Sequence, residues 1–378
     1  MASRFTVGDT SYGPGRVLVI AEIGTGHGGD AVKARELVAA AAESGADCAK
    51  FQCVFADEII HPATGAVPLP GGSVPLFERF RSLESESSFF AAAKRECEAR
   101  GLLFLCTPFG LRSARLLRGL GVAAMKVASP ELDHLPLLDE LASYGLPTML
   151  SCGVSTMGDI EAAVARFPSP LADSGGLALL HCVTAYPAPE EDYGLRLLAH
   201  LSALTGLPVG VSDHSLDPVL VPALSVAAGG CVVEKHICLS RADPGLDDPI
   251  ALPPGDFAAM SRAIRAAQAR SGAETTALLA AEFGRVRIEA ILGSGRKRLA
   301  PSEAANYGRT NRSIHALRAI SRGEALDASN AALLRTEKIL RPGLAPALLP
   351  AVLGRRARRD IPSGEGITWE DVGDLVDD

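Results

Sequence analysis

The sequence is poor in aromatic residues, which make up 5% of the chain, and it contains a single tryptophan. Because 47% of the residues are hydrophobic, the core must be built mainly from Ala, Leu and Val. That composition suits parallel strands buried beneath helices. An excess of positive charge is also missing, since the formal net charge is −7. Nucleic acid normally requires a basic surface, so a nucleic-acid partner is not expected.

Paired cysteines and long apolar runs are absent as well. None of the eight cysteines belongs to a Cys-x-x-Cys pair, which argues against a disulfide framework and for a reducing compartment. The chain has no apolar run of ~18 residues and no charged start followed by an apolar stretch, so no membrane span or signal peptide is predicted. We therefore expect a cytoplasmic protein.

What the sequence does contain is a regular alternation of apolar, strand-like runs with helix-like segments. The strand-like runs are residues 17–23, 46–52, 102–108, 123–129, 146–153, 176–184, 207–213 and 230–237. Eight such units within ~250 residues are typical of a closed (β/α)₈ barrel. We predict an α/β fold with this barrel over residues 1–272, and a doubly wound sheet is the competing architecture.

The rest of the chain departs from this rhythm. Residues 53–85 are rich in Pro and Gly and should form an ordered loop, and the first fifteen residues could form a short hairpin. Residues 273–311 are predicted to be a linker. Residues 312–378 contain a weak internal repeat and should form a small second domain, which would need contacts with another part of the protein to be stable.

Two histidines follow neighbouring strand-like runs. One run ends in Ser212-Asp213-His214, and the next ends in Glu234-Lys235-His236, so that the two imidazoles lie 22 residues apart in the sequence. Adjacent parallel strands joined by one helix would bring them together at the same rim, where they could bind a divalent metal with open positions. The alternative is that each histidine only serves its own strand end or a nearby carboxylate.

Polar residues occur at the carboxyl end of every predicted strand, which is where barrel enzymes carry their chemistry. In chain order these residues are Glu22, Lys50, Gln52, Thr107, Lys126, Ser129, Ser151, Thr184, Tyr186, Ser212, His214, Glu234 and His236. Two lysines with nearby hydroxyls suit a small dianion that carries phosphate and carboxylate groups. The alternatives are that each lysine pairs with Glu22 or Glu234, or that one lysine forms a Schiff base.

Several motifs then resemble one family. They are AEIGTGHGGD, GADCAKFQ, LFLCTPF, MKVASPEL, LSCGVSTMGDI, LLHCVTAYPAP, GVSDHSLD and VVEKHICL, in this order, with NRSIHALRAISRGEAL and LRPGLAP near the end. The chain resembles the sialic acid synthases, which make nonulosonic acids from phosphoenolpyruvate and an N-acylhexosamine. The C-terminal part is similar to the antifreeze-like SAF domain. The resemblance covers nearly the whole chain and implies a transferase that condenses phosphoenolpyruvate with an amino-sugar aldose such as N-acetylmannosamine.

The resemblance also implies roles for individual residues. His214 and His236 would hold Mn²⁺ or Mg²⁺, which would polarise the aldehyde of the open-chain sugar. The residues that would bind the phosphate and carboxylate of phosphoenolpyruvate are Lys50, Lys126, Thr107, Ser129 and Ser151. The residues that would lie toward the sugar or complete the substrate site are Gln52, Thr184, Tyr186, Ser212 and Asp247. Glu22 or Glu234 would position water and substrate.

Family members are domain-swapped homodimers, so Arg312 of the SAF domain would reach the sugar's N-acyl group in the partner's barrel. The chain departs from the family pattern at Thr184, Val211, Asp247 and Ala345, all of which the resemblance places on the sugar side. The acceptor could therefore be a modified hexosamine. The alternative functions are another barrel lyase, such as a Schiff-base aldolase, and a non-catalytic binding protein that uses the SAF domain.

Overall fold

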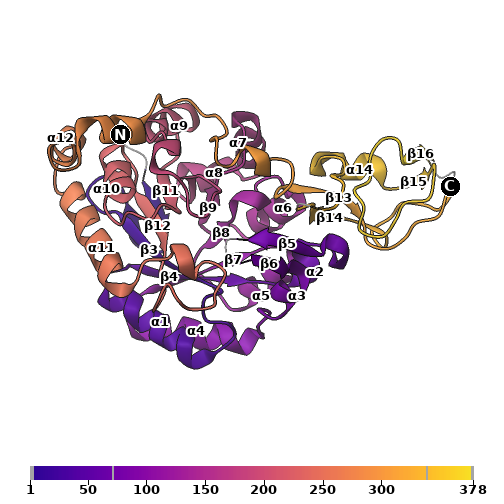
Figure 1. The fold of residues 1–378 in the computed structure, drawn as a ribbon, viewed down its shortest axis with the longest axis horizontal. Coiled ribbons are helices and arrows are strands. Elements are labelled where there is room, and N and C mark those ends of the chain that lie inside the picture. The colour runs from indigo at the N-terminus through magenta and orange to yellow at the C-terminus, as the bar shows by residue number, and fades with distance from the viewer. Residues whose placement is uncertain (1–3, 70–71, 338, 376–378) are drawn as a thin grey trace.

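The computed structural model describes residues 4–69, 72–337 and 339–375, which form a barrel with a smaller C-terminal domain at one side (Figure 1). The ends of the two predicted domains, residues 1–3 and 376–378, lie outside the described residues. Within the described part, no helix combines the length and the apolar character that crossing a membrane requires.

Eight parallel strands form the barrel, as the sequence predicts. They are β3 (Leu18–Gly24), β4 (Cys48–Cys53), β7 (Leu103–Pro108), β8 (Met125–Val127), β9 (Thr148–Ser151), β10 (Leu177–Cys182), β11 (Val209–Asp213) and β12 (Val232–His236). The strand order is β7-β4-β3-β12-β11-β10-β9-β8. The two end strands of this ladder, β7 and β8, lie against each other, so the barrel is nearly closed.

Helices cover the outside of the barrel (Figure 1). They are α1 (Ala31–Glu43), α4 (Ser87–Ala99), α5 (Leu111–Gly119), α6 (Leu135–Ser143), α7 (Met157–Val164), α8 (Ser169–Asp173), α9 (Leu197–Thr205), α10 (Leu220–Ala227) and α11 (Pro254–Gln268). Side chains alternate along each strand. On β3, Val19 and Ala21 therefore pack in the large cluster beneath the helices, whereas Leu18 and Ile20 belong to a separate cluster that fills the inside.

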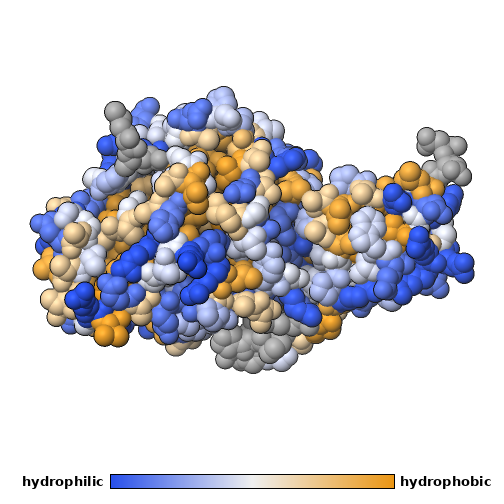
Figure 2. Space-filling model, turned by 90° about the horizontal axis from the view of Figure 1, so that it is seen from above, coloured by the Kyte–Doolittle hydropathy of each residue, from blue (hydrophilic) through white to orange (hydrophobic). Residues whose placement is uncertain are grey.

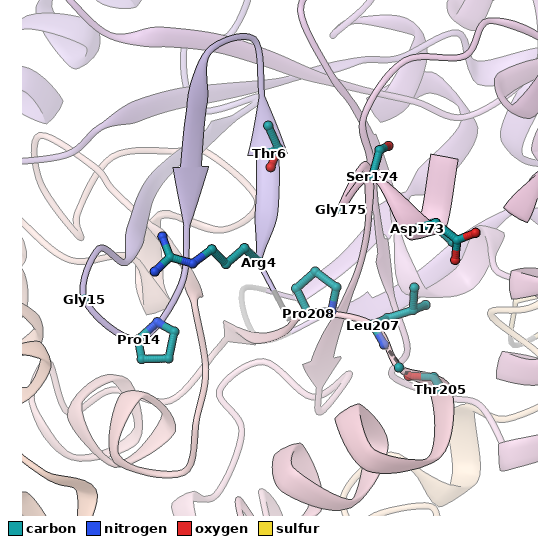
Figure 3. A pocket seen from close by; sticks show the side chains of 12 residues that line it. Arg4, Thr6, Pro14, Gly15, Asp173, Ser174, Gly175, Thr205, Leu207 and Pro208 are labelled. Carbon is teal, nitrogen blue, oxygen red and sulfur yellow. Dashed lines mark hydrogen bonds between the residues drawn. The ribbon is translucent and has the colours of Figure 1, made fainter. Parts of the chain in front are cut away.

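A hairpin of β1 (Phe5–Val7) and β2 (Thr10–Tyr12) closes the amino end of the barrel, and Phe5 is fully buried in the inner cluster. The hairpin is anchored where the Thr6 N–H donates to the carbonyl oxygen of Gly175 at 2.9 Å. A cavity of about 760 Å³ lies beside it, with Arg4 directed toward Pro14 (Figure 3). This cavity is at the end of the barrel opposite to the predicted chemistry.

The segment predicted as an ordered loop, residues 53–85, contains short elements of its own. These are α2 (Ala56–Ile59), β5 (Ala66–Leu69), β6 (Gly72–Pro75) and α3 (Leu76–Arg81), with β5 and β6 paired as an antiparallel hairpin. Ile59, Ile60, Phe77 and Phe109 form a small apolar cluster beneath it. The segment is therefore a structured wall on the carboxyl side of the barrel.

The predicted linker, residues 273–311, is helical over its first half. Helices α12 (Gly272–Phe283) and α13 (Arg285–Leu292) follow one another, and α12 packs against α10 on the barrel. Leu279, Ile288 and Ile291 are buried there in the main cluster. The Gly and Pro residues and the basic run, which suggested a linker, lie mainly after residue 292, and only that part is largely irregular.

The C-terminal domain consists of two antiparallel pairs, β13 (Arg312–Ala316) with β14 (Ala331–Arg335) and β15 (Arg355–Ala357) with β16 (Val372–Leu375), together with α14 (Leu349–Val352). Hydrophilic residues gather along one edge of its surface (Figure 2). The domain packs against the barrel of its own chain. Ile60 forms an isolated β-bridge with Arg335, and His61 Nε2 donates to the carbonyl oxygen of Leu317 at 3.1 Å. These contacts meet the predicted need for stabilisation from another part of the protein.

Candidate active site

A layer of polar side chains lies inside the barrel, one step above the apolar inner cluster. Because every second residue of a strand points inward, the positions that follow Ile20, Cys48 and Leu105 on this side are polar. The inward members are Glu22, Lys50, Thr107, Lys126, Ser151, Cys182, Ser212 and Glu234, all of them buried. Every strand contributes one. The structure thus brings together seven residues that the sequence analysis selected, and it adds Cys182.

Lys50 is held by two carboxylates. Its Nζ lies 2.9 Å from Glu22 Oε2 and 3.5 Å from Glu234 Oε1, and it donates to Thr107 Oγ1 at 3.1 Å. Gln52 Nε2 donates to Glu22 Oε1 at 2.7 Å. The pairing of a lysine with Glu22 and Glu234, which the sequence left open as an alternative, is therefore what this structure contains for Lys50.

Lys126 is held mainly by neutral groups. Its Nζ donates to Ser151 Oγ at 2.5 Å and to the carbonyl oxygen of Val127 at 2.9 Å, while Glu234 Oε1 is 4.0 Å away. Ser212 Oγ donates to Glu234 Oε1 at 2.9 Å. Lys126 therefore has the looser link to a carboxylate and is the more available of the two ammonium groups for an anionic ligand.

The two buried glutamates differ in proton affinity. Burial, together with the charge of Glu234, raises the pKa of Glu22 to about 7 despite the ammonium of Lys50. Burial acts in the same direction on Glu234, but Lys126 and Lys50 outweigh it and lower its pKa to about 2. Burial lowers the pKa of Lys126. Carboxylates whose pKa values are pushed apart can act as separate acid and base, so Glu22 is the group that can exchange a proton near neutral pH.

Hydroxyl groups from two neighbouring loops converge beside Lys126. Ser129 Oγ accepts from the Gly153 N–H at 3.0 Å, and a Cβ at position 153 would collide with Thr184 Oγ1. Thr184 Oγ1 is buried and has no hydrogen-bond partner among the described residues. A buried hydroxyl without a partner is rare in proteins, which marks this spot as a place for a ligand atom. Thr184 therefore lies beside Ser129 rather than only toward the sugar, where the resemblance placed it.

His214 and His236 approach each other at the rim, with ring centroids 5.7 Å apart. The Nδ1 of His214 lies 2.9 Å from the carbonyl oxygen of Val183, to which it donates, so Nε2 is the nitrogen left for a metal. Burial acts to lower the pKa of His214, but Cys182, whose Sγ lies 3.9 Å from Nδ1, outweighs burial and raises the pKa to about 9, so a metal would have to displace the proton on Nε2. Burial lowers the pKa of His236 to about 4, which keeps that ring neutral at pH 7. Tyr186 stacks on His214 at 4.2 Å between centroids.

A metal ion fits this arrangement as a two-histidine site with open positions. Asp247 is the nearest acid, with Oδ2 4.0 Å from His236 Nδ1. Across the described residues, no group of three or more His, Cys, Asp or Glu side chains is arranged to hold a metal. Substrate or water oxygens would thus have to complete the coordination, and the metal itself stays a prediction.

The rim opens into a cavity of about 830 Å³. The predicted residues that line it are Gln52, Thr184, Tyr186, His236 and Asp247. The sequence analysis missed two further members, Arg335 and Glu337, which the C-terminal domain contributes, as well as Arg79 from α3. Much of the remaining lining is apolar and comes from residues 54–80 and 244–250. No motif pointed to Arg335 and Glu337, because they enter the site only through the packing of the two domains.

The role predicted for Arg312 in a partner's barrel is not tested by this single chain and stays a prediction, but within its own chain Arg312 has other partners. The side chain is fully buried, and its Nε lies 2.5 Å from Glu131 Oε2. Its remaining donors reach backbone carbonyl oxygens, among them that of Phe109 at 2.6 Å and that of Leu333 at 3.1 Å. Within the single chain, each of the three guanidinium nitrogens thus donates to an oxygen of the protein. Arg335, which pairs with Arg312 across β13 and β14, is the arginine of the C-terminal domain that lines the cavity.

The fold agrees with what comparison with known proteins finds. The profile of the NeuB family matches residues 37–276, and that of the SAF domain matches residues 311–373. The N,N'-diacetyllegionaminic acid synthase of Legionella pneumophila is 30% identical over 94% of both chains. The N-acetylneuraminate-9-phosphate synthase of Homo sapiens is 31% identical over 70% of this chain and 74% of its own length.

Among solved structures, the spore coat polysaccharide biosynthesis protein SpsE of Bacillus subtilis superposes with a TM-score of 0.80 and 31% identity, and the match covers 100% of both chains. The family profile covers more than half of the chain, and relatives of at least 30% identity match most of its length. The chain therefore belongs to the NeuB family of acid synthases and carries a SAF domain at its carboxyl end.

Proposed function

We propose that this protein condenses phosphoenolpyruvate with an amino-sugar aldose to give a nonulosonic acid and phosphate. The observation that carries the proposal is the pair of buried lysines, Lys50 and Lys126, set between Glu22 and Glu234 inside the barrel. Gln52 joins this layer to the cavity, because it lines the cavity and donates to Glu22. Relatives that are named as synthases of sialic-type acids support the reaction class.

The anionic substrate fits the side of the site that holds the lysines and hydroxyls. Lys126 with Ser151, and Ser129 with Thr184, offer an ammonium group and hydroxyls within one buried region. Fixed donors in a site shielded from water bind phosphate and carboxylate strongly and stabilise charge that develops during the reaction. The wider, mostly apolar part of the cavity then receives the aldose.

Glu22 and water are sufficient for the proton transfers of this reaction. C3 of phosphoenolpyruvate forms a bond to the aldehyde carbon as the C2=C3 and C=O π bonds break, and the aldehyde oxygen takes up the proton that Glu22 receives from water. Water adds at C2 and gives a proton to Glu22, whose pKa of about 7 suits a base at neutral pH. The C2–O bond to phosphate then breaks as the C2 hydroxyl becomes a carbonyl, and the hydroxyl proton leaves with the phosphate. A divalent ion held by His214 and His236 would polarise the aldehyde as a Lewis acid.

The cellular compartment and the oligomeric state belong to the same proposal. The eight cysteines are all buried and free, which is compatible with a reducing compartment such as the cytoplasm. We expect a homodimer in solution, and domain exchange within it stays a prediction. In the single chain, the SAF domain already contributes Arg335 and Glu337 to the cavity of its own barrel.

The test is an assay of phosphate release from phosphoenolpyruvate with a panel of aldoses, which includes N-acetylmannosamine, its 6-phosphate and other N-acylhexosamines. Mass spectrometry identifies the acid that is formed, and each reaction is repeated with a chelator. Release with at least one aldose, and loss of it with the chelator, supports the proposal. Binding of phosphoenolpyruvate without turnover of any aldose favours a binding protein. Turnover that is unchanged by the chelator overturns the metal assignment.

A further inference from the structure

The segment of residues 294–311, here called the strap, connects the last barrel helix to the SAF domain and crosses the barrel rim. Three of its side chains hold the loops that follow β9 and β10. Lys297 Nζ donates to the carbonyl oxygen of Cys152 at 2.7 Å, Asn306 Nδ2 to that of Thr184 at 3.2 Å and Asn311 Nδ2 to that of Val154 at 3.1 Å. The strap is therefore attached to the two loops that carry Gly153 and Thr184.

Glu303 makes a different kind of contact from the strap. Its side chain is 1% exposed. One carboxylate oxygen, Oε2, accepts from the backbone N–H of Thr184 at 2.8 Å and from that of Val154 at 3.0 Å. The other, Oε1, accepts from the N–H of Ala300 at 3.2 Å. Burying a carboxylate is costly unless hydrogen bonds offset the loss of water, so these contacts hold Glu303 and the loops in one arrangement.

The loop that Glu303 holds is strained. Val154 has a φ of 39°, a conformation that β-branched residues rarely adopt. It directly follows Gly153, whose N–H donates to Ser129 Oγ at 3.0 Å and whose missing Cβ leaves room for Thr184 Oγ1. A strained backbone persists only where its surroundings enforce it. Glu303 enforces it here by binding the Val154 N–H and the Thr184 N–H with the same oxygen.

We propose that Glu303 is a positioning residue for the anionic substrate: it places the Thr184 hydroxyl and the Gly153 turn beside Ser129 and Lys126. The inference rests on the proposed function, because it assigns phosphoenolpyruvate to this end of the cavity. It also gives the strap a role beyond joining two domains. The carboxylate would not touch the substrate, and it acts through the two loops that it binds.

The direction in which the affinity for phosphoenolpyruvate changes when Glu303 is replaced separates a positioning role from a purely electrostatic or a purely structural one. If Glu303 acted only through its negative charge, neutralising it would tighten the binding of an anion. If it only attached the strap, its loss would lower stability and leave the affinity for phosphoenolpyruvate unchanged. A positioning role predicts weaker binding of phosphoenolpyruvate although a negative charge near the site has been removed.

The experiment compares wild-type protein with Glu303→Ala, Glu303→Gln and a control, Glu282→Gln, which neutralises an exposed glutamate on α12. Calorimetric titration with phosphoenolpyruvate should show roughly tenfold weaker binding for Glu303→Ala, the scale of one lost hydrogen bond to a charged group. Glu303→Gln should lose less, because its amide oxygen can still accept from the Thr184 and Val154 N–H groups. The control should bind as the wild type does.

Hydrogen exchange measured by NMR supplies a second readout that needs no substrate. The amides of Val154 and Thr184 should exchange faster in Glu303→Ala than in the wild type and the control, with Glu303→Gln in between. Unchanged affinity or tighter binding in both Glu303 variants overturns the inference, as does unchanged exchange. If wild-type protein does not bind phosphoenolpyruvate at all, the proposed function fails, and this result is distinct from equal binding by all four proteins.

Discussion

The carboxylate of Glu131 and the guanidinium of Arg312 form an ion pair that is excluded from solvent on both sides, with Oε2 and Nε 2.5 Å apart. Glu131 belongs to the short turn that begins at Ser129, and Arg312 is the first residue of the SAF strand β13. Arg335 of β14 binds the other oxygen of the same carboxylate at 2.5 Å. One buried acid of the barrel therefore pairs with two arginines of the SAF domain. This acid, Glu131, follows Ser129 of the candidate substrate site by two positions in the sequence.

Replacing Arg312 by methionine should destabilise the protein. Removal of the arginine leaves the buried carboxylate of Glu131 with Arg335 alone and takes a donor from two backbone carbonyl oxygens, and breaking a buried ion pair typically costs ~3–5 kcal/mol. We expect Arg312→Met to lower the free energy of unfolding by about this amount, measured by urea denaturation. The control is Arg318→Met, which removes an exposed pair with Glu324 and should cost no more than ~1 kcal/mol. A normal stability of Arg312→Met, with a specific loss of acceptor binding, would contradict the structural role.

The pH dependence of stability should also report on Glu131. Burial would raise the pKa of this carboxyl, but Arg312 and Arg335 outweigh burial and hold the pKa well below its usual value of 4.5. An acid with a depressed pKa stabilises the folded state at pH values above its unfolded pKa, and the contribution is lost as the pH falls below that value. The stability difference between wild type and Glu131→Gln should therefore shrink below pH ~4.5. A difference that stays constant between neutral pH and pH ~3 would contradict this assignment.

The rate of the proposed reaction should follow the titration of Glu22. Its pKa is raised to about 7, so the fraction of carboxylate, the form that can accept a proton, increases as the pH rises through neutrality. We expect the rate to rise along this limb, and Glu22→Gln to lose most of the activity together with the limb. The measurement is kcat as a function of pH at saturating substrates. An unchanged profile in Glu22→Gln would remove Glu22 from the proton transfer.

Much of the fold could be predicted from the sequence, because its local signals agree with one another. Each barrel strand is a short apolar run, and each places a polar residue at its carboxyl end, so the strand period alone brings Lys50, Lys126, Glu22 and Glu234 together. Closure of a parallel sheet then converts a list of strand ends into one site. For these residues, local spacing and topology contain the necessary information.

The contacts between domains could not be predicted in the same way. Arg312 and Arg335 look alike in the sequence, since both stand at an end of a short apolar strand. Their antiparallel register places them opposite each other. The packing of β13 and β14 against the barrel buries Arg312 on Glu131, whereas Arg335 also lines the cavity. The role of Glu303 likewise depends on how residues 294–311 cross the rim, which no periodicity specifies.

Loss of His236 should abolish metal-dependent turnover while the fold is kept. The ring sits at the rim, and no hydrogen bond to another described residue depends on it, so its removal should leave the barrel intact. We expect His236→Ala to show no phosphate release and much weaker binding of Mn²⁺ in a calorimetric titration, with an unchanged circular dichroism spectrum. The control is Arg95→Ala, which removes an exposed side chain on α4, a helix on the outside of the barrel. Full activity of His236→Ala would overturn the two-histidine site.

The alternative that Lys126 forms a Schiff base can also be tested. Burial lowers the pKa of Lys126, and a lysine with a lowered pKa can act as a nucleophile. Its ammonium is, however, held by Ser151 Oγ at 2.5 Å and by the carbonyl oxygen of Val127 at 2.9 Å, both of which accept hydrogen bonds from the charged form. We therefore expect it to bind an anion as an ammonium group rather than to attack a carbonyl.

Borohydride treatment in the presence of pyruvate should leave the mass of the intact protein unchanged, whereas an imine would be reduced to a stable adduct. Lys126→Met should weaken the binding of phosphoenolpyruvate at least tenfold, the order of magnitude expected for the loss of one hydrogen bond to a charged group. Lys94→Met, which removes a half-buried lysine paired with Glu98 on α4, is the control and should bind normally. A borohydride-dependent adduct that is present in wild type and absent in Lys126→Met would instead assign this barrel to the imine-forming aldolases.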